Sequence, residues 1–92
     1  MNSYKTSNGE RVKKSIIDRM VRSAKAQVLT NQFYEHGYNF CEDCKRSTGT
    51  YLDCSHNISV DKCQKQGKSE LAWDLNNIKV RCRNCHRKHD NL

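Results

Sequence analysis

Two pairs of cysteines stand out as residues whose type and spacing suit chemistry. Each pair is spaced by two residues, and 37 residues separate the two pairs. Two thiolates at this spacing converge on one ion from a tight turn, so two pairs complete a tetrahedral shell without strain. Four soft thiolates with no open position favour a structural zinc ion. We therefore predict a structural Zn²⁺ bound by Cys41, Cys44, Cys82 and Cys85.

Two further cysteines, Cys54 and Cys63, remain outside this set. We expect them to be free, partly buried thiols. They could also serve a second metal site, although no partner pair for one is evident. A redox dithiol is disfavoured, because such motifs normally lie in a βαβ context that this chain lacks.

His56 and Asn77 lie between the two cysteine pairs, and His86 directly follows the second pair. Hydrolysis of a phosphodiester needs a base with a pKa near neutrality and a hard cation that neutralises charge on the phosphorane and the leaving oxygen. His56 is largely neutral at working pH and can supply the base. His86, which directly follows the second pair, can hold the cation, and Asn77 lies between them in sequence. We therefore predict His56 and His86 as catalytic residues, whereas the role of Asn77 depends on the family resemblance described below.

Basic residues are concentrated in the same region. The chain carries a net charge of +7 and a sequence pI near 9.3, which favours a polyanionic partner. The segment 79–88 has five basic residues and no acidic one. We expect these side chains to seat the phosphates of a nucleic acid: Lys79, Arg81, Arg83, Arg87 and Lys88.

Composition limits the kind of protein that can hold these residues. Ninety-two residues with 35% hydrophobic character and a mean hydropathy of −1.01 make one small domain with a thin core, for which a staple is expected. The first residues lack an apolar signal region, and no stretch approaches the roughly 20 apolar residues that span a bilayer. We therefore expect an intracellular, cytoplasmic protein with no membrane partner, in which metal is favoured over disulfides.

The first 37 residues predict one basic amphipathic helical segment. Residues 1–8 are polar and are expected to be a frayed lead-in. A helix is predicted from about Glu10 to about Leu29, ending before Asn31 or Gly37. Its apolar stripe is expected to pack on the metal-bound half or, less favoured, to form a homodimer, and its basic face is either solvated or in contact with phosphates. The stripe comprises Val12, Ile16, Ile17, Met20, Val21, Ala24 and Val28, and the basic face comprises Arg11, Lys14, Arg19, Arg22 and Lys25.

Residues 38–92 predict a strand, a loop, a second strand and a helix. Tyr34, Tyr38 and Phe40 are expected to cap a small core before the first strand, residues 50–54. Residues 59–74 are expected to form an ordered loop with a helical turn at 69–73. In the second strand, residues 78–81, Ile78 and Val80 should face inward and the two basic residues outward. A short helix is predicted at 83–90.

From Phe40 to Asp90 the chain resembles the HNH endonucleases, in particular the group framed by two Cys-x-x-Cys pairs. The matching positions are His56, Asn77 and His86. The resemblance implies an α+β fold, a small zinc-stabilised ββα-metal (HNH) domain, here preceded by an N-terminal amphipathic helix. It also implies roles: the first His as general base, the Asn as a residue that holds the loop or touches the metal, and the last His as a ligand of a catalytic Mg²⁺ or another divalent ion.

One position departs from the family pattern. The family usually has Asp or His directly before the first His, and this chain has Ser55, a poorer ligand for a hard cation. Ser55 could bind weakly or through water, or Asp53 could reach in from the same strand face. Asp90 is favoured slightly, because it lies four residues after His86 on a helix. His89 is a further candidate.

These observations favour a metal-dependent HNH endonuclease that nicks or cuts DNA as a monomer or a homodimer. A zinc-stabilised nucleic-acid-binding module with a lapsed active site is the alternative, followed by a protein-binding zinc knuckle. The two histidines and the Asn favour the enzyme, since a pure binder has no need of them. Low sequence specificity is expected, and the resemblance implies a phage or mobile-element origin.

Overall fold

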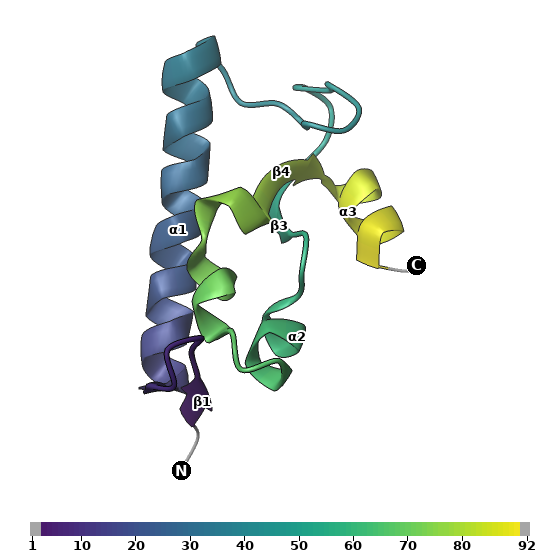
Figure 1. The fold of residues 1–92 in the computed structure, drawn as a ribbon. Coiled ribbons are helices and arrows are strands. Elements are labelled where there is room, and N and C mark those ends of the chain that lie inside the picture. The colour runs from purple at the N-terminus through teal and green to yellow at the C-terminus, as the bar shows by residue number, and fades with distance from the viewer. Residues whose placement is uncertain (1–2, 91–92) are drawn as a thin grey trace.

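The largest element of the computed structural model, which describes residues 3–90, is the helix α1, Lys14–His36. The outer residues of the two predicted segments, 1–2 and 91–92, lie outside this range. A small hairpin lies at the start of α1. A second hairpin, two shorter helices and two 3₁₀ turns lie along the side of α1 (Figure 1). The predicted α+β class is confirmed at this level, with two small antiparallel sheets.

The N-terminal residues form a hairpin and not the expected lead-in. Strand β1, Ser3–Lys5, pairs antiparallel with β2, Arg11–Lys13, and this pairing places Tyr4 opposite Val12. Both side chains pack against the core cluster. The turn includes Gly9 at φ 86°, a conformation that glycine adopts without strain. The prediction of a frayed segment is therefore wrong for residues 3–8, because Asn8-Gly9 turns a paired strand back on itself.

Helix α1 begins later and ends later than predicted. It starts at Lys14 because the three preceding residues belong to β2. It ends at Gly37, which adopts φ 83° and donates its backbone N–H to the Phe33 carbonyl at 2.7 Å. Of the two predicted stops, Gly37 is confirmed, whereas Asn31 lies inside the helix.

The main core joins α1 to the C-terminal half of the chain. Ile17 and Val21 pack with Cys63 and Ala72, as expected for an apolar stripe facing the metal-bound half. Ile16 and Met20 do not follow the prediction, since they are 38% and 39% exposed. The buried stripe is thus narrower than the apolar half of the helical wheel.

Cys63 and Ala72 belong to the segment that was predicted as a loop. The 3₁₀ helix η1, Ser69–Trp73, coincides with the predicted helical turn. The helix α2, Val60–Lys65, was not predicted. Its N-cap is Ser59, whose hydroxyl accepts a hydrogen bond from the Lys62 backbone N–H at 3.2 Å. A six-residue helix is too short for an apolar periodicity to show in the sequence.

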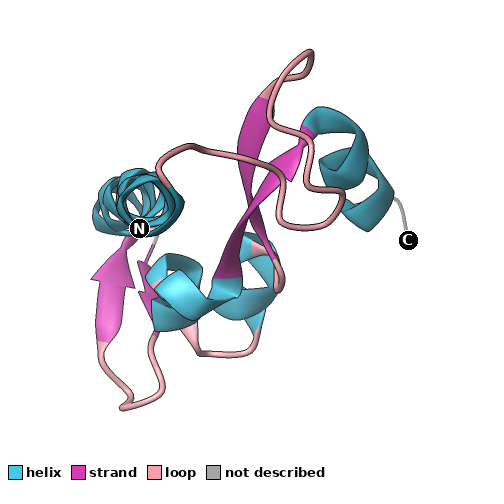
Figure 2. Cartoon of the chain, turned by 90° about the horizontal axis from the view of Figure 1, so that it is seen from above, coloured by secondary structure: helices cyan, strands magenta, loops and turns pink. Residues whose placement is uncertain are grey.

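The second sheet lies between α1 and the C-terminal helix (Figure 2). Strand β3, Leu52–His56, pairs antiparallel with β4, Ile78–Cys82, and the register places His56 opposite Ile78. The first strand therefore begins and ends two residues after its predicted bounds, and a 3₁₀ turn, η2, Leu75–Asn77, leads into the second. Helix α3, Arg83–Asp90, follows as predicted. None of the helices between residues 3 and 90 has the length and apolar character needed to cross a membrane.

Candidate metal centre and histidine pocket

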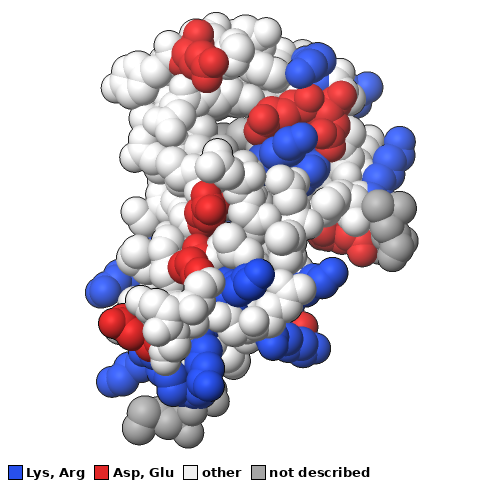
Figure 3. Space-filling view, in the orientation of Figure 1, with Lys and Arg blue, Asp and Glu red and all other residues white. Residues whose placement is uncertain are grey.

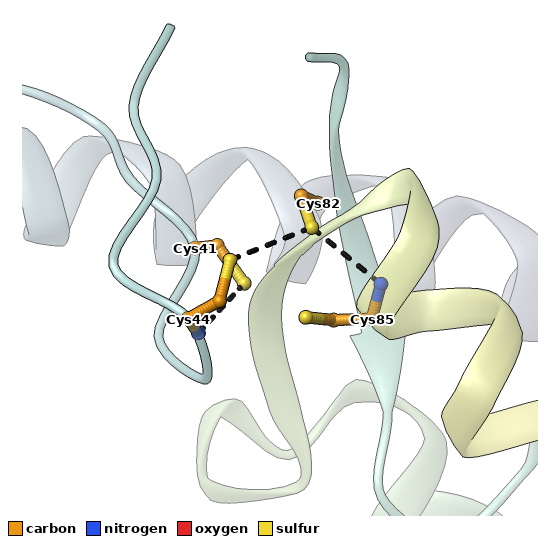
Figure 4. A group of neighbouring side chains, drawn as sticks. All are labelled: Cys41, Cys44, Cys82 and Cys85. Carbon is orange, nitrogen blue, oxygen red and sulfur yellow. Dashed lines mark hydrogen bonds between the residues drawn. The ribbon is translucent and has the colours of Figure 1, made fainter. Parts of the chain in front are cut away.

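The four paired cysteines meet at one point between the loop after α1 and the start of α3 (Figure 4). Their sulfur atoms all lie within 4.8 Å of one another. The Sγ atoms of Cys44 and Cys82 are 3.7 Å apart, close to the edge of about 3.8 Å that Zn–S bonds of about 2.3 Å give in a tetrahedron. The predicted clustering is confirmed, and this set can bind a metal ion such as zinc: Cys41, Cys44, Cys82 and Cys85.

The two pairs share one local geometry. The backbone N–H of Cys44 donates to the sulfur of Cys41 at 3.4 Å, and that of Cys85 donates to the sulfur of Cys82 at 3.5 Å. Burial raises the pKa of Cys41, but backbone hydrogen bonds from Cys44 and its neighbours outweigh it and lower this pKa to about 6. The Cys82 side chain, together with burial, raises the pKa of Cys85 to about 12. Four thiolates this close repel one another, so full ionisation of the cluster requires a bound cation.

Two polar side chains outside the predicted set hold the first cysteine loop in place. Gln32 of α1 is buried, donates to the Phe40 carbonyl at 3.0 Å and accepts from the Phe40 N–H at 3.0 Å. Glu42 donates its backbone N–H to the Val80 carbonyl at 2.8 Å and accepts the Val80 N–H on its carboxylate at 2.7 Å. Sequence reasoning missed both residues, because isolated Gln and Glu are ordinary surface residues in a polar chain.

The other two cysteines are free and partly or fully buried, as expected. The Cys54 thiol donates to the Lys25 carbonyl at 3.5 Å, and the Cys63 thiol donates to the Ile58 carbonyl at 3.6 Å. Burial raises the pKa of both thiols, which keeps them protonated near neutral pH.

Beside the sheet, a small cavity of about 170 Å³ brings three predicted site residues together. We call it the histidine pocket. His56 enters it from the end of β3, and His86 and Asp90 enter it from α3. It is also lined by Lys25, Cys54, Ser59 and Val60.

His56 is half-buried and held by one hydrogen bond. Its Nε2 lies 2.7 Å from the Ala72 carbonyl oxygen, which can only accept. Nε2 therefore carries the hydrogen in the neutral ring, and Nδ1 is the basic nitrogen. Burial lowers the pKa of His56 below its ordinary value, opposed by the hydrogen bond to Ala72 and assisted by the positive charge of Lys25. The ring is therefore neutral at neutral pH.

Asn77 is buried and pins the segment that follows His56. Its amide oxygen accepts the Ile58 N–H at 2.8 Å, and its amide nitrogen donates to the carbonyls of Ile58 at 3.0 Å and Leu71 at 2.9 Å. Asn77 does not line the histidine pocket. Its contacts fit the first of the two expected roles, in which the Asn holds the loop.

His86 lies between two carboxylates. Its Nδ1 is 3.1 Å from Asp53 Oδ2, and its Nε2 is 3.1 Å from Asp90 Oδ2. A neutral imidazole has one N–H, so only one ring nitrogen can donate to a carboxylate. The lone pair of the other nitrogen faces the second carboxylate unless a proton or a cation lies between them. Hydrogen bonds from Arg83, opposed by burial and assisted by His86, lower the pKa of Asp53. Both Asp alternatives to Ser55 thus contact His86, on opposite sides of its ring.

Ser55 does not reach the pocket. It is 1% exposed, and its hydroxyl accepts a hydrogen bond from Arg81 Nη1 at 2.9 Å. Arg81 also donates to Asp43 at 2.8 Å and to Asn57 at 2.8 Å. The prediction that Arg81 faces outward is wrong, because the side chain is 5% exposed and its donors are engaged. The inward orientation of Ile78 and Val80 is confirmed.

His89 contributes to the position of α3. Its Nε2 lies 3.1 Å from the backbone carbonyl oxygen of His56, to which it donates. This contact ties the helix that carries His86 to the strand that carries His56. His89 does not line the histidine pocket.

The predicted phosphate contacts differ in their availability. Arg87 and Lys88 are exposed on α3. Arg83 pairs with Asp53 at 3.2 Å and lies over the Tyr51 ring at 4.9 Å, and Lys79 lies 4.0 Å from Asp43. On the face shown in Figure 3, basic side chains gather toward the N-terminal hairpin and along the side that holds α3, with acidic side chains among them.

The three aromatic residues before the sheet do not act together. Phe40 is buried and contacts Tyr38 and His36. Tyr34 and Tyr38 are 83% and 52% exposed. The expectation that all three cap a core is therefore correct only for Phe40.

Comparisons with protein-family models, curated proteins and solved structures gave no match for this chain.

Proposed function

We propose that this chain is a metal-dependent endonuclease of the HNH type that hydrolyses phosphodiester bonds in DNA. The observation that carries the proposal is the shared pocket of His56 and His86, in which His56 presents a neutral ring with Nδ1 as its basic nitrogen. The antiparallel strands β3 and β4, followed by α3, also agree with the ββα arrangement that the resemblance implies, with α2 and two 3₁₀ turns between the strands.

His56 acts as the general base. Its Nδ1 accepts a proton from the attacking water, and the Ala72 carbonyl stabilises the imidazolium that results through the hydrogen bond at Nε2. The oxygen of the water attacks the phosphorus, and the bond between the phosphorus and the 3′-oxygen breaks. The products are a 5′-phosphate and a 3′-hydroxyl. Asn77 holds the loop beside the base through its contacts with Ile58 and Leu71.

His86 and Asp90 would hold the divalent cation. Their facing atoms are 3.1 Å apart, which matches the edge of about 3 Å between neighbouring ligands in an octahedral Mg²⁺ site with bonds of about 2.1 Å. Asp53 would accept the Nδ1 hydrogen of His86 and orient the ring. A cation between Nε2 and Asp90 would then remove the repulsion between the Nε2 lone pair and the Asp90 carboxylate. When bound, the cation neutralises charge on the phosphorane and the leaving oxygen.

One observation favours a second candidate, a zinc-stabilised nucleic-acid-binding module without activity. Within residues 3–90, the four cysteines are the one set of three or more His, Cys, Asp or Glu ligand atoms close enough to share an ion. His86 and Asp90 thus offer a pair, and Ser55 adds nothing to it. Mg²⁺ often binds through one or two carboxylates with several waters, so a pair is sufficient for the enzyme.

The two candidates differ in one experiment. Supercoiled plasmid is incubated with the purified protein and Mg²⁺, Mn²⁺ or Ni²⁺, with brief EDTA treatment and metal re-addition as a control. The enzyme predicts nicked plasmid with metal and none with EDTA. Asp90→Asn should lower the rate strongly, whereas Asp61→Asn, which changes an exposed carboxylate paired with Lys65, should not. Plasmid binding without cleavage in any metal would favour the module.

A further inference from the structure

Lys25 is the one cationic side chain of α1 that lines the histidine pocket. It lies in the middle of the helix and is partly buried, whereas most other basic residues of α1 are exposed. Its backbone carbonyl accepts the Cys54 thiol at 3.5 Å, which places this turn of α1 directly against β3. Its positive charge acts to lower the pKa of both His56 and Cys54.

No carboxylate within residues 3–90 forms an ion pair with Lys25. Other lysines are paired at short range, as in Lys14 with Asp18 at 3.1 Å and Lys65 with Asp61 at 3.0 Å. The carboxylate that shares the pocket, Asp90, pairs with His86 instead. An anion in the pocket would give this ammonium the charged partner that it lacks within the described residues.

We propose that Lys25 makes the histidine pocket a binding subsite for a phosphodiester anion, so that α1 completes the site formed by β3 and α3. The identity of the anion rests on the proposed nuclease function. A neutral His56 adds no positive charge that would repel this ammonium, and the pocket volume of about 170 Å³ accommodates one phosphate group.

This arrangement predicts where Lys25 acts during hydrolysis. The phosphorane carries one more negative charge than the bound phosphodiester, so a fixed ammonium stabilises it more than the ground state. Loss of Lys25 should lower kcat by about 10²-fold, the range found for a single electrostatic donor, with a small change in KM. KM depends mainly on exposed basic residues that contact flanking phosphates.

The subsite is tested by binding, independently of cleavage. The dinucleotide dTpdT, which has one phosphodiester, is titrated into the protein at low salt, and the ring signals of His56 and His86 are followed by NMR. Lys25→Met keeps the aliphatic stem, and Lys13→Met removes one exposed positive charge from β2 by the same change of side chain. We expect binding at the pocket for the wild type and for Lys13→Met, and at least tenfold weaker binding for Lys25→Met.

Equal binding by Lys25→Met and Lys13→Met, or no response of the two rings in the wild type, would overturn the subsite. Plasmid assays with the same variants separate this inference from the proposed function. Cleavage that survives Lys25→Met at the Lys13→Met rate rejects the subsite and keeps the nuclease. Binding of dTpdT through Lys25 by a protein that cleaves nothing supports the subsite and rejects the nuclease.

Discussion

At the scale of single residues, the hydrogen bond between His56 Nε2 and the Ala72 carbonyl decides which nitrogen of the ring is basic. Burial at this position disfavours the charged ring, so the base is ready at neutral pH. A histidine on the surface would be a poorer base, because a solvated ring is fixed in neither one tautomer nor one orientation. The Ala72 carbonyl thus fixes the tautomer and the orientation of the ring, and burial keeps the ring neutral.

The lowered pKa of His56 predicts how activity depends on pH. The neutral form is the active one, so the rate should fall on acidification with a midpoint below the ordinary histidine pKa of about 6.5, as the ring becomes protonated. The measurement is kcat/KM for plasmid nicking from pH 5 to 8 at fixed Mg²⁺. A rate that already falls between pH 8 and 7 would contradict this assignment.

Asn77 should matter for stability as well as for activity. Replacement by Ala strands the Ile58 and Leu71 backbone groups that the amide now satisfies, at a cost of about 1–3 kcal/mol for each group left unpaired. Asn76, its exposed neighbour, provides the matched control. Urea unfolding of Asn77→Ala and Asn76→Ala measures the difference. Equal midpoints for the two variants would show that the buried amide does not hold the loop.

At the scale of elements, Arg81 links the cysteine cluster to the strand that carries His56. Its guanidinium joins Asp43 of the first cysteine loop to Ser55 and Asn57, the two residues that flank His56. The strand is therefore fixed at both neighbours of the base. Under the proposed HNH function, the serine directly before the base would serve this network and not the cation.

Replacement of Arg81 tests this link. Arg81→Met keeps the volume of the side chain and should lower the free energy of unfolding by about 2–3 kcal/mol, as expected for a buried hydrogen bond to a charged group. Arg83→Met is the control, since its pair with Asp53 is half exposed and an exposed ion pair contributes little to stability. Thermal and urea unfolding of both variants provide the comparison. A smaller loss in Arg81→Met than in Arg83→Met would contradict the structural role.

The elements that the sequence predicted best are those with a strong local pattern. Gly37 ends α1 as a C-cap glycine should, and the alternation of Ile78 and Val80 correctly oriented β4. The short helix α2 and the β1–β2 hairpin were missed because few residues carry each and their burial depends on partners distant in the chain. Arg81 was misplaced because its polarity suggested solvent, whereas Asp43 and Ser55 satisfy it inside.

At the scale of the whole molecule, the core is too small to be the main source of stability. Its central cluster has four buried residues, Ile17, Val21, Cys63 and Ala72. A second buried group surrounds the cysteine cluster and includes Phe40, Ile78 and Val80. The spacing of the cysteines alone predicted this centre. The pocket needed the fold, because Lys25 reaches it only when α1 packs on β3.

Loss of one cysteine of the cluster should therefore unfold the protein. A structural zinc contributes about 10–16 kcal/mol in small domains, comparable with the whole stability of about 5–15 kcal/mol. Cys82→Ser should lose zinc and its cooperative melt, whereas Cys54→Ser, outside the cluster, should keep both. Circular dichroism and native mass spectrometry measure the two properties. A zinc-free Cys82→Ser protein with a native-like melt would contradict a stabilising metal centre.

The plasmid-nicking rates of His56→Ala and His36→Ala show whether His56 is the base of a reacting site or a structural histidine. They are measured with Mg²⁺ on proteins shown to be folded and zinc-loaded. His36 ends α1, is partly exposed and does not line the histidine pocket. We predict a rate at least 10²-fold below wild type for His56→Ala and a near wild-type rate for His36→Ala. Equal rates for the two variants would contradict the account.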